Sequence, residues 1–211
     1  MPRGLHLDRL ALRADGAPPI ALDARVAPGE VLTVMGPSGA GKSTLLAAVM
    51  GTLSPAFRLT GRVLLDGKDI TGLPPEARRV GILFQDELLF PHLSVGGNLF
   101  FGLPAGVRGR AARARAVTQA LAEVELDGFA DRDPATLSGG QKARVALMRT
   151  LLAEPGALLL DEPFARLDPA LRDQVRRLVF SRAAERGLPV LLVTHDADDA
   201  RAAGGRVVTL A

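Results

Sequence analysis

The sequence predicts an α/β fold with a mostly parallel sheet, an antiparallel N-terminal part and an inserted helical subdomain. Short apolar, β-prone segments alternate with helical patterns in both end regions, which is the arrangement that builds a parallel sheet covered by helices. A glycine-rich segment near residue 40 joins one of these strands to a helix. From about residue 86 to residue 155 the pattern becomes mainly helical.

The first 35 residues carry three strand patterns. Apolar and polar residues alternate over Leu5–Leu12, but the alternation changes phase halfway, which predicts a half-buried strand with a slip in register. A turn over Asp15–Pro19 leads into a second strand, Ile20–Val26. The short apolar segment Val31–Met35 predicts a buried strand that runs directly into the glycine-rich segment.

Further elements follow along the rest of the chain. In order, they are a helix over Ser43–Met50, a hairpin around Arg62–Gly67, a strand over Val80–Phe84, helices over Arg110–Val124 and Lys142–Leu152, and strands over Ala157–Leu160, Val190–Val193 and Arg206–Leu210. We expect residues 1–85 and 156–211 to form the α/β core. Residues 86–155 are expected to form the helical subdomain.

Composition narrows the class of protein. The chain has 211 residues, of which 47% are hydrophobic, so it can bury a substantial core. It has no cysteine, which excludes disulfides and thiolate metal sites, and we find neither a secretory signal nor an apolar run long enough to span a membrane. The net charge is only +3 and the arginines are spread among acidic residues, so charge gives no reason to expect nucleic-acid binding.

The glycine-rich segment has the pattern of a phosphate-binding loop. Its residues are Gly36, Pro37, Ser38, Gly39, Ala40, Gly41, Lys42, Ser43 and Thr44. Glycines let successive backbone N–H groups turn towards phosphate oxygens, and the helix that follows adds the positive end of its dipole. Lys42 supplies a charge for the β- and γ-phosphates, and the Ser43 hydroxyl is a ligand for Mg²⁺. The pattern and its flanking strand and helix predict a P-loop NTPase core of the RecA-like kind that binds ATP.

Two carboxylates follow the apolar strand Ala157–Leu160. Strand ends at one edge of a parallel sheet are where α/β folds place their sites. We expect Asp161 to hold Mg²⁺ and Glu162 to act as general base towards the attacking water.

A second glycine-rich turn lies before the helical stretch Lys142–Leu152. It consists of Leu137, Ser138, Gly139, Gly140 and Gln141, and it resembles the signature sequence of the ABC-type ATPases. At a helix N-terminus, its hydroxyl and amides suit an anion. The resemblance implies that the signature of one chain closes over the ATP held by a second copy, so that two copies bury two ATPs head to tail.

Three further residues of this chain resemble residues of other sequence motifs of this family. Gln85, after a short apolar strand, resembles the glutamine that contacts Mg²⁺ or the water and senses the γ-phosphate. His195 resembles the switch histidine that contacts the γ-phosphate. Asp168 resembles the end of the loop that crosses the dimer interface, but Ala165 stands where the family usually has serine, and this puts one hydrogen bond between the chains in doubt.

The adenine site departs from the family pattern. The family usually stacks adenine on an aromatic residue in the first strand region, whereas this chain has no Tyr and no Trp, and the equivalent place falls near Arg13 or Ala14. Either the Arg13 guanidinium stacks on the base or adenine is held more loosely. Both alternatives predict that GTP competes better than usual.

Most of the chain resembles the importer branch of the family, and is most similar to YnjD-type subunits and their thiamine- and iron-importer relatives. The resemblance implies a homodimer of ATPase subunits at the cytoplasmic face of the cell membrane. It also implies integral membrane permease subunits and, indirectly, a substrate-binding protein. The apolar patch on which a permease would dock is expected to consist of Phe90, Leu93, Val95, Phe100 and Phe101. The alternative for each of these residues is that it belongs to the buried core of the subdomain.

The leading alternative is a soluble ABC-type ATPase that acts on DNA or ribosomes. The stretch between Gln85 and Ser138 is too short for the long coiled coil that DNA-repair members usually carry, and it shows no sustained heptads. Ribosome-acting members usually have two such domains in one chain. The transported substrate is not encoded in these motifs.

Overall fold

The computed structural model describes residues 3–16 and 18–210. It divides the chain into two compact units, which we describe separately. Unit 1 comprises the described residues of Met1–Ile82, Gly156–Glu162 and Phe180–Ala211, and unit 2 comprises Leu83–Pro155 and Pro163–Val179. The long helix α5 (Pro169–Glu185) begins in unit 2 and ends in unit 1.

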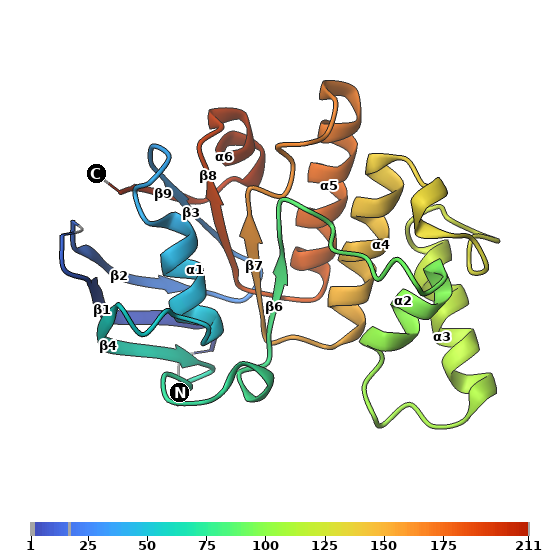
Figure 1. Ribbon diagram of the computed structural model, residues 1–211, viewed down its shortest axis with the longest axis horizontal. Coiled ribbons are helices and arrows are strands. Elements are labelled where there is room, and N and C mark those ends of the chain that lie inside the picture. The colour runs from blue at the N-terminus through green and yellow to red at the C-terminus, as the bar shows by residue number, and fades with distance from the viewer. Residues whose placement is uncertain (1–2, 17, 211) are drawn as a thin grey trace. The chain divides into compact units, whose positions relative to one another are not determined.

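Unit 1 contains two sheets (Figure 1). The five-stranded sheet has the order β6-β7-β8-β3-β9, in which β3 pairs in parallel with β8 and β9, and β7 pairs in parallel with β8. Its strands are β3 (Val31–Met35), β6 (Val80–Leu83), β7 (Ala157–Asp161), β8 (Val190–Thr194) and β9 (Arg206–Thr209). The antiparallel sheet has the order β2-β1-β4-β5, with strands β1 (Leu5–Arg13), β2 (Ile20–Val26), β4 (Arg58–Leu65) and β5 (Lys68–Asp69). The predicted α/β fold with an antiparallel N-terminal part is confirmed.

The slip expected in the first strand is a bulge in β1. Its register with β2 shifts between Leu7 and Leu10, and Arg9 within the bulge has a φ of 47°. The neighbouring strand accommodates the bulge with Gly61, where a β-carbon would lie 2.2 Å from the Arg9 carbonyl oxygen. The bulge lets leucines on both sides of it face the core.

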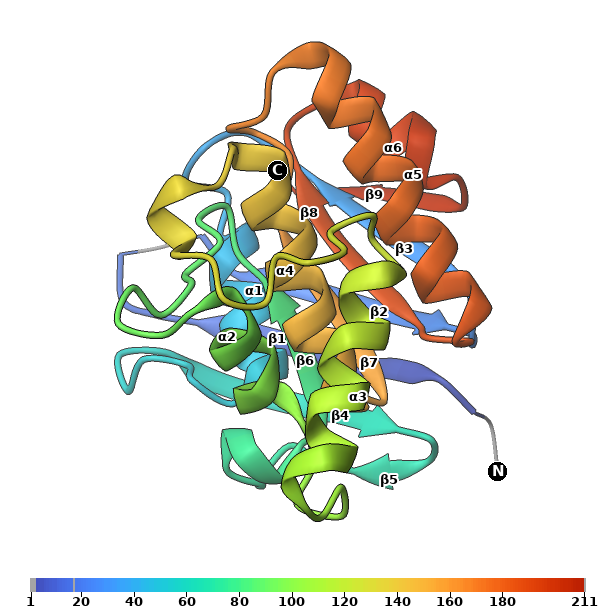
Figure 2. The same cartoon turned by 90° about the vertical axis from the view of Figure 1, so that its right-hand side faces the viewer.

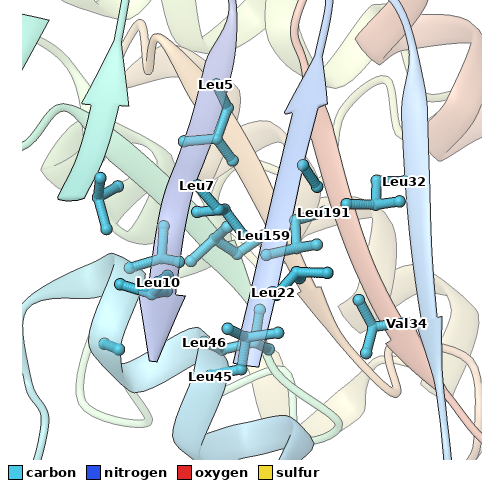
Figure 3. Packing of buried hydrophobic residues seen from close by; sticks show 14 of the residues in the cluster. Leu5, Leu7, Leu10, Leu22, Leu32, Val34, Leu45, Leu46, Leu159 and Leu191 are labelled. Atoms are coloured by element: carbon cyan, nitrogen blue, oxygen red, sulfur yellow. The ribbon is translucent and has the colours of Figure 1, made fainter. Parts of the chain in front are cut away.

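The core of unit 1 lies between its two sheets and the helix α1 (Lys42–Met50). Leu45 and Leu46 of α1 pack with leucines of both sheets, as Figure 3 shows. Leu159 of β7 and Leu191 of β8 are fully buried in the same cluster. Because this cluster holds α1 against the parallel strands, it fixes the direction in which the N-terminus of α1 points.

Unit 2 is mainly helical (Figure 2), and α2 packs against both α3 and α4. Its helices are α2 (Val95–Gly102), α3 (Arg110–Ala122), α4 (Gly139–Leu152) and the first part of α5. Val95, which we expected in the exposed docking patch, is fully buried. For Val95 the alternative of buried core therefore holds, because this residue opens α2 on the face that packs into the unit. Phe100 and Phe101 are exposed, at 43% and 68%.

Short elements complete the chain: α6 (Ala197–Ala203) and the 3-10 turns Pro75–Ala77 and Pro134–Thr136. Among the described residues, no helix is both long and apolar enough to cross a membrane.

Candidate nucleotide site

The phosphate-binding loop connects β3, a strand inside the parallel sheet, to α1. Gly41, directly before the helix, has a φ of 84°, and a β-carbon there would lie 2.2 Å from Ile20 Cδ1. Gly36 is equally restricted, because its β-carbon would come within 2.9 Å of the Leu210 carbonyl oxygen. These positions therefore require glycine, and the resulting tight loop directs the first amides of α1 towards the site.

Lys42 begins α1 and is almost fully buried, with 7% of its surface exposed. Its Nζ donates to the carbonyl oxygens of Gly36 and Pro37 at 2.8 and 3.0 Å, and lies 3.8 Å from Glu162 Oε1. The ammonium group is thus held inside the curl of the loop, at the place where the loop would surround a phosphate.

The ends of three adjacent parallel strands, β3, β8 and β7, bring the other predicted residues of unit 1 together. Ser43 Oγ donates to Asp161 Oδ1 at 3.3 Å, and His195 Nδ1 lies 3.1 Å from Glu162 Oε1. Glu162 has a φ of 46°, and its N–H donates to the Val193 carbonyl oxygen at 3.0 Å. A strained backbone at this point turns the carboxylate out of the strand and is common at functional sites.

Asp161 and Ser43 form a fitting donor pair for Mg²⁺. Burial raises the pKa of the Asp161 carboxyl, and the nearby Glu162 raises it further, whereas the Ser43 hydrogen bond and the Lys42 charge lower it. A divalent cation would offset this desolvation. The described residues contain no cluster of three or more His, Cys, Asp or Glu side chains suited to a metal. The donor set therefore fits a Mg²⁺ ion that takes its remaining ligands from water and phosphate.

A hydrogen-bond network that the sequence analysis missed supports the turn that carries His195. The Thr194 hydroxyl donates to Asp199 Oδ2 at 2.9 Å and accepts from the Asp196 N–H at 3.0 Å. Asp196 is the N-cap of α6, and its Oδ1 accepts from the Asp198 N–H. Asp199 is 3% exposed, so this is a buried support for the exposed His195 ring. The only hint in the sequence was a threonine at the end of an otherwise apolar strand.

The signature residues begin α4 in unit 2. Ser138 is the N-cap: its Oγ accepts from the Gln141 N–H at 3.3 Å, and Gln141 Oε1 accepts from the Ser138 N–H at 3.0 Å. A β-carbon on Gly140 would lie 2.4 Å from the Leu171 side chain, so any larger residue at the helix start would force Leu171 of α5 to shift. The turn therefore presents Gly139 and a capped helix N-terminus, which is favourable for an anion.

Two further predicted residues also belong to unit 2. Asp168 Oδ1 accepts from the Leu171 N–H at 3.1 Å, near the start of α5. Gln85 is exposed in the segment after β6, and its neighbour Asp86 forms an ion pair with Arg166. Asp168 thus has a hydrogen-bond partner within unit 2, and Gln85 is exposed there.

Comparisons with known proteins identify the family of the chain. The family model described as "ABC transporter" matches residues 21–165. The ABC transporter ATP-binding protein YnjD of Escherichia coli (strain K12), itself uncharacterized, is 54% identical over 171 residues, which cover 81% of this chain and 78% of YnjD. The thiamine import ATP-binding protein ThiQ of Cereibacter sphaeroides is 47% identical over 207 residues, which cover 98% of this chain and 88% of ThiQ.

A solved structure shows the same fold. The ATP-binding cassette MJ0796, in a dimeric post-hydrolysis state bound to ADP and Pi, superposes with a TM-score of 0.79 at 30% identity, covering 98% of this chain and 94% of that one. The family model spans the phosphate-binding loop, the signature and the Asp161–Glu162 pair. The chain is therefore an ATP-binding protein of the ABC transporter family, and an ATPase.

Proposed function

We propose that the chain is the ATP-hydrolysing subunit of a bacterial importer, and that two copies close head to tail around two ATPs. The observation that carries this proposal is the meeting of Lys42, Ser43, Asp161 and Glu162 at the strand ends of unit 1, together with a capped, glycine-containing helix start at Ser138 in unit 2. The relative MJ0796 is dimeric in its solved structure, which supports pairing.

The residues of unit 1 suggest a division of labour in hydrolysis. Lys42 binds the β- and γ-phosphates and disperses their charge in the transition state. Ser43 and Asp161 would hold Mg²⁺, which neutralises phosphate charge when bound. Glu162 orients the attacking water and takes its proton. His195, whose Nδ1 lies 3.1 Å from Glu162 Oε1, is proposed to contact the γ-phosphate.

The remaining site residues serve the second copy. We propose that Ser138, with the amides of Gly139 and Gly140, contacts the γ-phosphate bound to the other chain, with Gln141 keeping the helix start capped. Asp168 is proposed to lie at the interface between the copies. Because each ATP then touches both chains, closure depends on the γ-phosphate, and its loss on hydrolysis releases the pair.

Import, rather than another use of ATP, is supported by the relatives. Besides the thiamine import protein, a spermidine/putrescine import ATP-binding protein of Frankia alni is 45% identical over 190 residues, which cover 90% of this chain and 40% of that protein. These relatives share import but differ in cargo, so we propose a peripheral subunit that docks on integral membrane permeases at the cytoplasmic face. Phe100 and Phe101, which are both exposed, are the proposed centre of the docking surface. The Phe101 ring packs edge-on against the Phe90 ring, with the two ring centroids 4.7 Å apart.

The variant Glu162→Gln tests the hydrolytic pair. It should bind Mg·ATP as the wild type does, lose about 10²–10⁴-fold in turnover, and form a stable dimer in saturating ATP by light scattering. Glu76→Gln, an exposed control far from the strand ends, should change none of these properties. A Glu162→Gln chain that stays monomeric with ATP bound would refute the proposed pairing.

The membrane partner is tested by capture from detergent-solubilised membranes of the source cell with a tagged wild-type chain. Recovery of an integral membrane protein by the wild type, but not by Phe101→Ser, supports the docking surface. Co-purification of ribosomes or DNA instead would replace import with the alternative class of function.

A further inference from the structure

His195 has an exposed ring that the proposed reaction requires in one place. Its side chain is 61% exposed, so packing restrains the imidazole little. Its Nδ1 nevertheless lies 3.1 Å from Glu162 Oε1, beside the carboxylate that is proposed to take the proton of the attacking water. The position of the ring therefore depends on how firmly the backbone of His195 is held, and that backbone belongs to the turn between β8 and α6.

Two side chains fasten the backbone on either side of His195. Thr194 Oγ1 accepts from the Asp196 N–H at 3.0 Å, which closes a turn around the histidine. Asp196 Oδ1 accepts from the Asp198 N–H at 2.7 Å at the start of α6. A threonine hydroxyl is the weaker of these two turn formers, and it rotates and can donate instead of accept. The turn around His195 therefore needs a group that fixes the direction of the Thr194 hydroxyl.

Asp199 of α6 fixes that direction. It is 3% exposed, and its Oδ2 accepts from Thr194 Oγ1 at 2.9 Å. An ionised carboxylate only accepts hydrogen bonds, so the Thr194 hydroxyl points its hydrogen at Asp199 and its lone pairs at the Asp196 N–H. Burying a carboxylate costs desolvation energy that an apolar residue at the same place in α6 would not cost. The carboxylate therefore indicates a role beyond packing.

The same stretch of β8 also holds Glu162. The Glu162 N–H donates to the carbonyl oxygen of Val193, the residue before Thr194, at 3.0 Å. Thr194 faces away from the core cluster to which Val193 belongs and towards α6, which packs on β8. Two neighbouring residues of one strand thus hold the backbones of Glu162 and His195. The distance between the carboxylate and the imidazole is therefore set from β8, and Asp199 completes the side on which His195 lies.

We propose that Asp199 is a positioning residue for ATP hydrolysis: through the Thr194 hydroxyl it fixes the turn that carries His195, and so keeps the imidazole against Glu162. This inference rests on the proposed function, in which Glu162 and His195 act on the attacking water and the γ-phosphate. Because Asp199 is buried, it acts on the nucleotide through these residues. Its replacement should therefore lower the rate of hydrolysis without changing how tightly Mg·ATP is bound.

Thr194→Val and Asp199→Asn test the inference in an ATPase assay. Valine has the shape of threonine without the hydroxyl, so Thr194→Val should lower kcat about 10- to 100-fold, with KM for Mg·ATP changed by less than about twofold. The amide of Asp199→Asn donates as well as accepts, so it orients the hydroxyl less strictly, and the loss should be smaller. Thr194→Ser, which keeps the hydroxyl, should retain most of the wild-type kcat. Asp199→Asn keeps the size of the side chain, so the inference is still tested if Thr194→Val does not fold.

A double-mutant cycle with His195→Ala separates positioning from mere stability. If Thr194 and Asp199 act through His195, neither variant should lower kcat further in a chain that already lacks the imidazole. A residue that only stabilises the fold would lower kcat by the same factor with or without the imidazole. An equal further loss in the His195→Ala chain would therefore overturn the inference.

NMR of the histidine rings gives a second readout that does not depend on activity. The chain has three histidines, His6, His92 and His195, so labelled histidine gives three ring signals, and His195→Ala identifies the one that matters. Asp199→Asn leaves the neighbours of His195 in sequence unchanged, and it should shift the His195 signal alone. An unshifted signal would show that Asp199 does not position the ring.

Thr33→Val is the matched control. Thr33 is a fully buried threonine of β3, the strand beside β8, and its hydroxyl forms no hydrogen bond within the part of the chain that the structure describes. Its replacement should leave kcat and all three ring signals unchanged. The melting temperature should not fall, because no hydrogen bond is lost.

His195→Ala also separates failure of this inference from failure of the proposed function. If it loses turnover while Thr194→Val and Asp199→Asn hydrolyse ATP like the wild type, Asp199 is not a positioning residue, although the role of His195 stands. If His195→Ala itself hydrolyses ATP like the wild type, the proposed role of His195 is refuted, and this inference with it.

Discussion

Arg78 offers a prediction whose size follows from its contacts. This arginine lies just after the 3-10 turn Pro75–Ala77 and is 5% exposed. Its Nη1 donates to the carbonyl oxygens of Ala48 and Val49 at 2.8 and 2.9 Å, in the last turn of α1. Nε donates to the Leu73 carbonyl oxygen at 2.7 Å, and Nη2 donates to that of Thr71 at 2.5 Å.

We expect Arg78→Met to destabilise the chain without changing the residues that contact nucleotide. Leaving the two buried carbonyls of α1 without a donor costs about 2–6 kcal/mol. Burial lowers the pKa of the Arg78 guanidinium, so its removal also recovers some desolvation energy. The net loss in the free energy of unfolding should therefore be about 2–4 kcal/mol, a large fraction of the usual stability of a domain. Arg78→Lys, which keeps the charge but not the fork, should lose less.

Urea unfolding, followed by circular dichroism, measures this loss. The urea concentration at the midpoint should fall, while the slope of the free energy of unfolding against urea concentration should stay unchanged. Arg201→Met is the control, because this arginine also lies in unit 1 but has a 77% exposed side chain. It should change the free energy of unfolding by less than about 0.5 kcal/mol. If Arg78→Met lost no more than this control, the buried carbonyls would have found other donors, and the stabilising role of the Arg78 hydrogen bonds would be refuted.

Two further predictions concern nucleotide binding. Lys42→Ala should weaken Mg·ATP binding about 10- to 100-fold, because it removes a charge-assisted contact to phosphate. Titration calorimetry measures this affinity, with Lys68→Ala as the control. A Lys42→Ala chain that binds Mg·ATP like the wild type would contradict the role of Lys42. GTP should compete with ATP within about tenfold in affinity, because Arg13 or Ala14 stands where the family usually has the aromatic residue that stacks on adenine. A strong preference for ATP in competition binding would count against loose recognition of the base.

The sequence predicted the sheet strands well because their signals are local. Alternation, apolar runs and flanking turns located the strands to within a few residues, and even the bulge of β1 was visible as a change of phase between leucines. The helices α2, α5 and α6 were not located. In α5, Leu171, Val175, Leu178 and Val179 recur at the spacing of one helix face, so the signal for this helix was present in the sequence and was overlooked.

The strand-end residues could be placed for a different reason. A parallel sheet brings the carboxyl ends of its strands to one edge, so a loop after β3, two carboxylates at the end of β7 and a histidine after β8 had to meet. That inference needs only the type of sheet and the positions of polar residues at strand ends. The contact of His195 with Glu162 at 3.1 Å is its outcome. Their roles in hydrolysis stay predictions until Glu162→Gln is measured.

Arg78 and Arg149 were not predicted, and the reason is chemical. Both donate to backbone carbonyls, and a carbonyl is present at every residue, so no complementary side chain in the sequence marks the partner. Asp161, in contrast, could be assigned because the phosphate-binding loop indicates the site to which a carboxylate at a strand end would belong. Because the chain is rich in arginine, the sequence alone does not single out these two. What distinguishes Arg149 is the strained residue to whose carbonyl it donates: Leu88 has a φ of 45°, and only a structure reveals a backbone angle of that kind.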